Sequence, residues 1–295
     1  MSVTLPLPDR AGAYRPVKLR LYHHSDGARI AYREAGTGQA LALVHSKGLS
    51  HREWEPVVDE LSHRYRLVLP DLPLHGDSED RPHHPYTEEW LCEVLAGFLR
   101  EACGPRPLVG GHDVGALLLL RAIADGHLRP GRLVLMPASL HHRPQRSGRE
   151  LLARGAIRAG AVPGLDRALS HAARLAVRPR LGDRLTATGA PGARDLVRHA
   201  FMDLGGNANR ARSWAKAVRR WPHGGQHDLL DLYERLDMPV LLLWADEDRR
   251  HPVEIAEEAL DLLPDGQLRV LPRTGFLIAY DDPVGLAREL AAFCG

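Results

Sequence analysis

Residues 107–115, Pro-Leu-Val-Gly-Gly-His-Asp-Val-Gly, decide the fold of this chain. The apolar start of this segment predicts a strand that is buried on both faces. The next segment, residues 114–125, is strongly apolar and predicts a helix. Asp113 therefore occupies a sharp strand-to-helix turn between Gly111 and Gly115, where glycine permits a close approach of the backbone. Such a turn pushes its central side chain above the carboxyl edge of the sheet, where open α/β sheets bind ligands.

The same alternation of buried strands and helices continues on both sides of this turn. It indicates a mostly parallel sheet covered by helices on both faces, which is the α/β class. The strands are expected at residues 17–24, 28–35, 41–45, 65–71, 107–112, 132–138, 239–246 and 267–272. The helices are expected at residues 51–63, 87–102, 114–125, 252–263 and 283–294.

One segment interrupts the alternation. Residues 139–226 are rich in Gly, Pro and Arg and contain short helical patches but no convincing strand. We therefore expect a core domain of residues 1–138 and 227–295 and a mostly helical inserted domain of residues 139–226. Residues 141–226 contain 17 Lys+Arg and 5 Asp+Glu, although the net charge of the whole chain is +2. This asymmetry indicates either an anionic ligand or simply Arg-rich, solvated helices.

Composition excludes several classes of protein. The 44% hydrophobic content and the small net charge are those of a globular chain and not of a disordered one. The longest apolar runs are too short to span a membrane, and the N-terminus lacks a secretory signal pattern. The three cysteines, Cys92, Cys103 and Cys294, have neither metal-ligand spacing nor the even number of a disulfide framework. We expect a cytoplasmic protein.

No cofactor, metal or macromolecular ligand is expected. The chain has no phosphate-binding loop and no glycine-rich dinucleotide motif. The pair His141-His142 lacks a further metal ligand at helical spacing, so no metal is assigned. Nucleic acid is not expected because the basic segment lacks interleaved aromatic residues. The expected partner is a small-molecule substrate, with a homodimer left open and no membrane contact.

Four segments together resemble the α/β-hydrolase family, and the resemblance extends from about residue 17 to residue 294. They are His45-Ser46-Lys47-Gly48 after one strand, residues 71–78 after the next, Gly111–Gly115 at the turn, and residues 244–248 after a later strand. The similarity is strongest to the branch with an aspartate nucleophile, which contains epoxide hydrolases and haloalkane dehalogenases. It implies an α/β-hydrolase fold in which residues 139–226 form a helical cap.

The resemblance also implies roles for individual residues. Asp113 matches the nucleophile, and Asp248 matches the acid of the catalytic triad, with Asp246 as a second choice. The backbone N–H groups of Lys47 and Val114 match the oxyanion hole. The side chains expected in the pocket are His45, Ser46 and Phe276.

This sequence departs from the family at the triad histidine. The family places that histidine in a segment resembling Gly-His-Phe-x-x-x-Glu-x-Pro, and the matching residues 275–283 have Phe276 at the histidine position. No histidine follows His251, and no tyrosine lies between residues 87 and 232, where related epoxide hydrolases carry acidic cap tyrosines. An aspartate nucleophile implies alkyl chemistry, because attack on an epoxide or alkyl halide gives a stable ester whereas attack on a carbonyl gives an anhydride.

Three interpretations remain open. In the preferred one, Asp113 acts as a general acid or base in epoxide or ring opening, cyclisation, isomerisation or elimination of a small organic substrate. The basic segment favours an anionic substrate. In the second, the protein is a true epoxide or other hydrolase with a substitute base. In the third, it is a catalytically inactive binding module. The candidate substitute bases are His141, His142, His171, His199, His223, His227 and His251.

Overall fold

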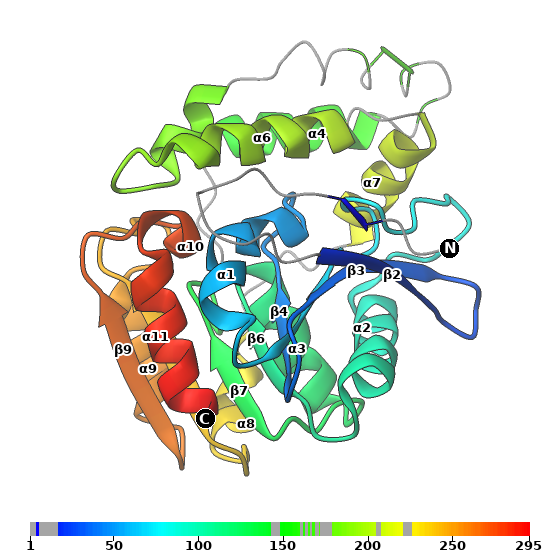
Figure 1. Ribbon diagram of the computed structural model, residues 1–295. Coiled ribbons are helices and arrows are strands. Elements are labelled where there is room, and N and C mark those ends of the chain that lie inside the picture. Colours follow the sequence, from blue (N-terminus) through cyan, green and yellow to red (C-terminus); the bar gives the residue numbers. More distant parts are fainter. Residues whose placement is uncertain are drawn as a thin grey trace.

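The computed structural model describes residues 4–5, 17–142, 148–159, 162, 165, 167–168, 171, 179–204, 208–220 and 226–295. Within them lies one sheet with the strand order β1-β2-β3-β5-β4-β6-β7-β8-β9 (Figure 1). The strands are β1 Thr4–Leu5, β2 Val17–His23, β3 Arg29–Ala35, β4 Ala40–Val44, β5 Arg66–Pro70, β6 Leu108–Gly111, β7 Arg132–Leu135, β8 Val240–Ala245 and β9 Gly266–Leu271. The pairs β1–β2, β2–β3 and β3–β5 are antiparallel. The pairs β5–β4, β4–β6, β6–β7, β7–β8 and β8–β9 are parallel.

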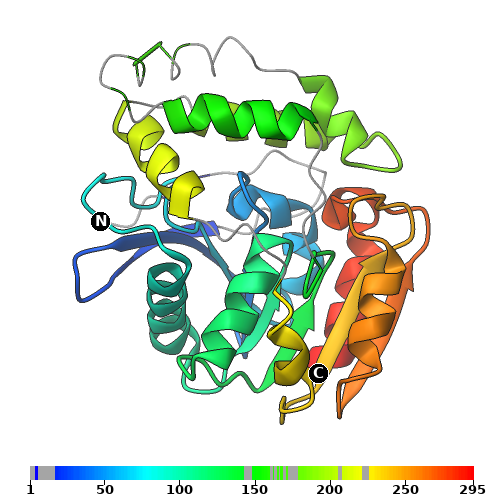
Figure 2. The ribbon, with the colours of Figure 1, turned by 180° about the vertical axis from the view of Figure 1, so that it is seen from behind.

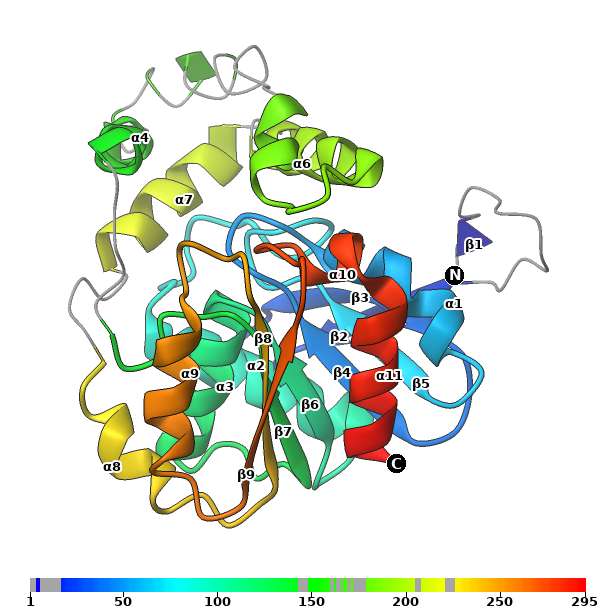
Figure 3. The same cartoon turned by 90° about the vertical axis from the view of Figure 1, so that its left-hand side faces the viewer.

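Helices cover both faces of the sheet, as the views from behind and from the side show (Figures 2 and 3). One hydrophobic cluster joins the sheet to α2 Glu88–Cys103, α3 Val114–Ala124, α8 Leu229–Tyr233 and α9 Val253–Leu260. A second cluster joins it to η1 His51–Val57, α1 Val58–Leu61, α10 Ile278–Asp281 and α11 Pro283–Cys294. All residues of β4 and β8 are buried, as expected for strands that are covered on both sides. The predicted α/β class and the predicted core strands are thus confirmed, and so are the predicted core helices apart from the one at residues 51–63.

Local chemistry explains the main difference from the expected elements. The segment predicted as one helix at residues 51–63 is a 3₁₀ helix followed by a single α-helical turn. Pro56 lies inside the 3₁₀ part, and proline lacks the N–H that an α-helix needs. The short helices α8 and α10 were not predicted, because four or five residues are too few to show a helical period.

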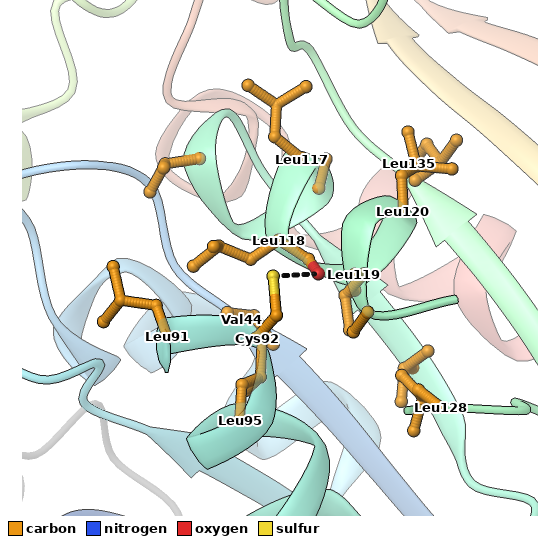
Figure 4. Close-up of a cluster of buried hydrophobic side chains, with 14 of the residues drawn as sticks. Val44, Leu91, Cys92, Leu95, Leu117, Leu118, Leu119, Leu120, Leu128 and Leu135 are labelled. Carbon is orange, nitrogen blue, oxygen red and sulfur yellow. Dashed lines mark hydrogen bonds between the residues drawn. The ribbon is translucent and has the colours of Figure 1, made fainter. Parts of the chain in front are cut away.

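The packing of α3 fixes the start of that helix, where Asp113 lies. The leucines of α3 interleave with those of α2 and with the sheet (Figure 4). The Cys92 thiol of α2 donates a weak hydrogen bond to the carbonyl oxygen of Leu118 in α3, at 3.5 Å. Burial holds the pKa of Cys92 far above its usual range, so this thiol is a packing group and not a nucleophile.

Further helices lie over one end of the sheet (Figures 1 and 3). They are α4 Gly148–Ala159, η2 Pro179–Arg184, α6 Pro191–Leu204 and α7 Ala208–Arg220. Polar side chains of α7 bind carbonyl oxygens of a core loop: Ser213 Oγ donates to Asp80 at 2.7 Å and Lys216 Nζ donates to His84 at 2.6 Å. We propose that residues 139–226 form one inserted cap, as the sequence predicts. In the described part of the chain, no helix is long and apolar enough to cross a membrane.

Candidate active site

Asp113 has the backbone conformation that the sharp turn requires. It lies two residues after the end of β6 and directly before the first residue of α3, and its φ of 48° lies in the left-handed region. A Cβ atom at Gly111 would lie 2.6 Å from the backbone of Gly115. A Cβ atom at Gly115 would lie 2.5 Å from the carbonyl oxygen of Val44. Both glycines are therefore required for steric reasons, and the strain at Asp113 is of the kind found at functional sites.

The two carboxylate oxygens of Asp113 face different groups. Oδ2 accepts a hydrogen bond from the backbone N–H of Lys47 at 3.2 Å. Oδ1 lies 3.9 Å from Nε2 of His251. Val114 is the first residue of α3, next to Asp113. Lys47, Val114 and Asp113 are thus brought together as the sequence predicts.

His251 is held by Asp248, which precedes it by three residues in the loop between β8 and α9. The Nδ1–H of His251 donates to Oδ2 of Asp248 at 2.9 Å, so its Nε2 faces Asp113. Both side chains are buried. Burial alone raises the pKa of Asp248, but the hydrogen bond and the charge of His251 lower it, and the pKa lies below its usual value.

The second choice for the acid, Asp246, has a different task. Its Oδ1 accepts a hydrogen bond from the backbone N–H of Thr274 at 3.0 Å, which connects the loop after β8 to the loop after β9. Asp246 is exposed, whereas Asp248 is buried beside a histidine. The geometry supports Asp248 as the acid.

A histidine faces Asp113, although it does not come from the position that the family pattern indicates. Phe276 does occupy the expected histidine position, and its ring centroid lies 5.8 Å from that of His251 and 4.4 Å from that of His112. His251, which comes from another loop, faces Asp113 instead. Sequence reasoning included His251 among the candidates but had no signal to select it, because the loop conformation brings its ring to Asp113.

The cap histidines contact other groups. His141 and His142 contact Glu258, and His199 contacts the carbonyl oxygen of Asp195. His223 lies outside the described residues. Among the ion pairs of the described residues, His251 is the histidine that approaches Asp113. The structure thus gives no support to a cap histidine as the base.

A buried polar network supports the turn from below. The backbone N–H and the hydroxyl of Ser46 both donate to Oε2 of Glu53, at 2.7 and 2.9 Å. Oε1 of Glu53 accepts a hydrogen bond from Nδ1 of His112. Burial opposes the charged form of His112, but the charge of Glu53 outweighs it, so the pKa of His112 is raised. Ser46, where the family pattern has glycine, therefore anchors the loop that presents Lys47.

His45 also supports this loop and does not act as a proton carrier. Its Nδ1–H donates to the carbonyl oxygen of Ser46 at 2.8 Å, and its Nε2 accepts from the backbone N–H of Leu72 at 2.9 Å. Burial lowers the pKa of His45, so the ring is neutral and both nitrogens are occupied. The pocket residues named from the sequence are therefore buried neighbours of the site.

Two cavities extend from the site toward the cap. The larger has a volume of about 220 Å³ and lies between core residues, including Lys47 and His75, and cap residues, including Trp214. The smaller, of about 20 Å³, reaches Val114. Trp214 lines both cavities, is 8% exposed, and its Nε1 has no hydrogen-bond partner among the described residues. Lys47, whose backbone N–H binds Asp113, lines both cavities, and the larger one can hold a small organic molecule.

The fold and the site together define a class. An aspartate at a strained strand-to-helix turn, a backbone donor to it, and a histidine held by a second aspartate lie together at the end of the parallel strands, and this turn is the one that α/β hydrolases have. Residues 39–283 match the model of the alpha/beta hydrolase fold family, and the chain belongs to that family.

Several proteins that are similar to this chain are hydrolases. The chain is 28% identical over 276 residues to a 2-hydroxy-6-oxo-2,4-heptadienoate hydrolase of Pseudomonas putida, which covers 90% of this chain and 93% of that protein. A thermophilic esterase from Thermogutta terrifontis is similar in structure, with a TM-score of 0.71, 19% identity, and coverage of 94% of this chain and 97% of that one. An epoxide hydrolase also has a TM-score of 0.71, with 16% identity and coverage of 94% and 98%. The protein is an α/β-hydrolase-fold enzyme.

Proposed function

We propose that this enzyme hydrolyses an alkyl electrophile, an epoxide or an alkyl halide, through an ester formed at Asp113. The observation that carries the proposal is the environment of that carboxylate. Oδ2 of Asp113 accepts from the Lys47 N–H, and Oδ1 faces His251, which is bound to Asp248. Attack by a carboxylate suits an sp³ carbon, because the ester that forms is stable until water cleaves it.

The first step uses Oδ1 of Asp113 as the nucleophile. This oxygen attacks the substrate carbon, a C–O ester bond forms, and the carbon–leaving-group bond breaks with its electron pair going to the epoxide oxygen or the halide. Oδ2 stays on the Lys47 N–H and becomes the carbonyl oxygen of the ester.

The second step uses His251 as the base. The separation of 3.9 Å between Nε2 and Oδ1 is too long for a hydrogen bond, which leaves Nε2 available to a water molecule. His251 takes a proton from water, and the hydroxide adds to Cγ of Asp113. The N–H groups of Lys47 and Val114 stabilise the oxyanion. Collapse releases the ester oxygen of the product as an alkoxide, which takes the proton from His251. The remaining proton of the water leaves Asp113 for the alkoxide formed when the epoxide opened or, after loss of a halide, for solvent, and this restores the carboxylate.

The cap supplies a donor for the leaving group. The side chain of Trp214 lines the cavity, and its Nε1–H is buried and has no partner among the described residues. A buried N–H without a partner costs about 1–3 kcal/mol, and an oxygen or halide anion of the bound substrate would satisfy it. This donor takes the place that tyrosines hold in the related epoxide hydrolases.

The other two interpretations fit the site less well. The replacement of the family's histidine by Phe276 favours acid–base chemistry without an ester, but His251 faces Asp113 and is positioned to act as the base. A binding module has no need for a strained aspartate or for a buried histidine–aspartate pair. The anionic character of the substrate remains part of the proposal.

The test is the source of the oxygen in the product. Wild-type enzyme in excess over a terminal epoxide, in H₂¹⁸O, should give unlabelled diol in a single turnover and ¹⁸O in Asp113 by peptide mass analysis. The His251→Ala variant should stop at the first step and accumulate one substrate mass on Asp113. A bromoalkane tested in parallel distinguishes the two electrophiles.

His227→Ala is the matched control, because it removes an exposed histidine of the same region. It should turn over like wild type. Appearance of ¹⁸O in the diol during the first turnover would mean that Asp113 activates water directly, and the ester mechanism would be wrong. Absence of both turnover and adduct with either electrophile would remove the proposed substrate class.

A further inference from the structure

Three side chains with metal-ligating atoms meet where the chain leaves the core for the cap. His141 and His142 follow β7, and Glu258 lies on α9. Oε2 of Glu258 lies 3.0 Å from Nε2 of His141 and 2.7 Å from Nε2 of His142. One ligand atom from each residue lies within 4.8 Å of the others. More than 100 residues separate the histidines from Glu258, so no local motif could reveal the cluster.

We propose that His141, His142 and Glu258 form a site for a divalent transition-metal cation of the zinc type. Two imidazole nitrogens and one carboxylate oxygen are the donor set that Zn²⁺, Co²⁺ and Ni²⁺ prefer. The same set disfavours Ca²⁺ and Mg²⁺, which require mainly oxygen ligands. This site is separate from the hydrolytic site and does not rest on the proposed function.

The geometry requires only small movements to admit the cation. Metal–ligand bonds of about 2.0–2.1 Å at tetrahedral angles place the ligand atoms about 3.3 Å apart. The contacts of 3.0 and 2.7 Å must therefore open by a few tenths of an ångström. The side chains of Glu258 and His142 are 55% and 41% exposed, so both can adjust, and the fourth position is accessible to water.

His141 is the fixed member of the set. Its side chain is 6% exposed and its ring packs edge-on against Tyr233 of α8, with the centroids 5.8 Å apart. The hydroxyl of Tyr233 lies 3.5 Å from Nδ1 of His141. When Nε2 binds a metal, Nδ1 carries the proton and points to this hydroxyl oxygen. An outer partner of this kind orients a metal-bound histidine.

The position of the site gives it a structural consequence. It connects the first residues beyond β7, at the entry to the cap, with α9, which begins two residues after His251. A bound cation would fix the entry of the cap segment against this helix. Because the cation binds the folded chain, it should also raise the unfolding temperature.

The experiment is a metal titration of the full chain after treatment with EDTA. Competition with a chromophoric chelator measures the affinity for Zn²⁺. We expect this affinity to be at least about tenfold lower in His142→Ala and in Glu258→Gln than in the wild type. Co²⁺ should give the intense visible absorption of a four-coordinate site with nitrogen ligands in the wild type only. Both substitutions affect accessible side chains, so the fold should be retained, and circular dichroism checks this.

The matched controls are Glu257→Gln, on the same helix, and His63→Ala, an exposed histidine elsewhere. Both should bind Zn²⁺ like wild type. Zn²⁺ affinity and unfolding temperature that do not change in His142→Ala and Glu258→Gln would overturn the proposal. Loss of Zn²⁺ binding in His251→Ala alone would overturn it too, by placing the cation at the hydrolytic site.

Discussion

At the scale of single residues, the unusual feature is the distance along the chain between acid and base. Asp248 and His251 are three residues apart, and their hydrogen bond of 2.9 Å lies within one loop. The acid fixes the tautomer of the base by accepting from Nδ1, and this leaves Nε2 available toward Asp113. The chemistry of the site therefore depends on Asp248 as a positioning residue.

This dependence predicts the effect of Asp248→Asn. The amide can donate to Nδ1 and so favour the wrong tautomer, which should lower kcat by about 10²–10⁴-fold in steady-state assays with an epoxide or bromoalkane. Ester formation on Asp113 should persist, so mass analysis should find the adduct accumulating. The comparison is Asp246→Asn, which removes charge from a loop contact and should leave kcat within a few fold. The reverse order of effects would assign the acid to Asp246.

At the scale of elements, one buried carboxylate joins three parts of the site. Glu53 in η1 binds Ser46 of the loop after β4 and His112 at the end of β6. The side chain of Glu53 is 2% exposed, so its charge is stabilised by these partners and not by water. η1 thereby controls the distance between the loop that presents Lys47 and the turn that presents Asp113.

Because the pKa of His112 is raised, we expect Glu53→Gln to lower the free energy of unfolding by an amount that depends on pH. The pKa of His112 is higher in the folded protein than in the unfolded chain, where it is about 6.5. Its contribution to the free energy of unfolding is therefore complete below pH 6.5, and it is lost as the pH rises through the pKa of the folded state. Urea unfolding at pH 6 should therefore show a loss of about 3 kcal/mol in Glu53→Gln. The loss should shrink at pH 9.

Glu55→Gln provides the control for this measurement. Its partner Arg52 lies in the same element, 3.2 Å away, and both side chains are partly exposed. Such a pair contributes about 0–1 kcal/mol, so the variant should unfold like wild type at both pH values. A loss in Glu53→Gln that is equal at pH 6 and pH 9 would mean that His112 is not charged in the folded protein.

At the scale of the whole molecule, the segment that includes the proposed cap, residues 141–226, carries 17 Lys+Arg and 5 Asp+Glu. Lys216 and Arg220 of α7 donate to carbonyl oxygens of His84 and Pro85, which hold the side chains in place but are neutral. The basic helix α7, which carries these side chains, also contributes Trp214 to the cavity between core and cap. A positive rim attracts anions and steers them toward the site.

Steering predicts a salt effect that depends on the charge of the substrate. For an epoxide with a carboxylate group, kcat/KM should fall several-fold between about 20 and 300 mM salt, as the Debye length shrinks from roughly 20 to 6 Å. A neutral epoxide of similar size should show a flat response in the same stopped-flow or steady-state assay. Arg219→Gln should reduce the slope for the anionic substrate only. Equal salt dependence of the two substrates would show that the cap charge has no role in substrate capture.

The sequence was sufficient to predict the core strands of the sheet and one part of the site, the turn that carries Asp113. Apolar runs such as residues 41–45 and glycines such as Gly111 and Gly115 act locally, so they indicate buried strands and the turn at Asp113 without knowledge of the fold. The approach of His251 to Asp113 depends on how a loop folds back over the sheet edge. The family pattern pointed instead to position 276, where the chain has Phe276.

The short loop that holds acid and base together also bears on how such a site can change during evolution. Position 276 no longer has to supply the base, and its side chain packs with Leu49 and with Leu196 of the cap helix α6. In a chain with histidine at both 251 and 276, either residue could act as the base. One of the two could then be substituted without loss of activity. With the base at position 251, residue 276 can vary together with the substrate. Libraries that vary residue 276 should therefore yield altered selectivity more often than dead enzymes.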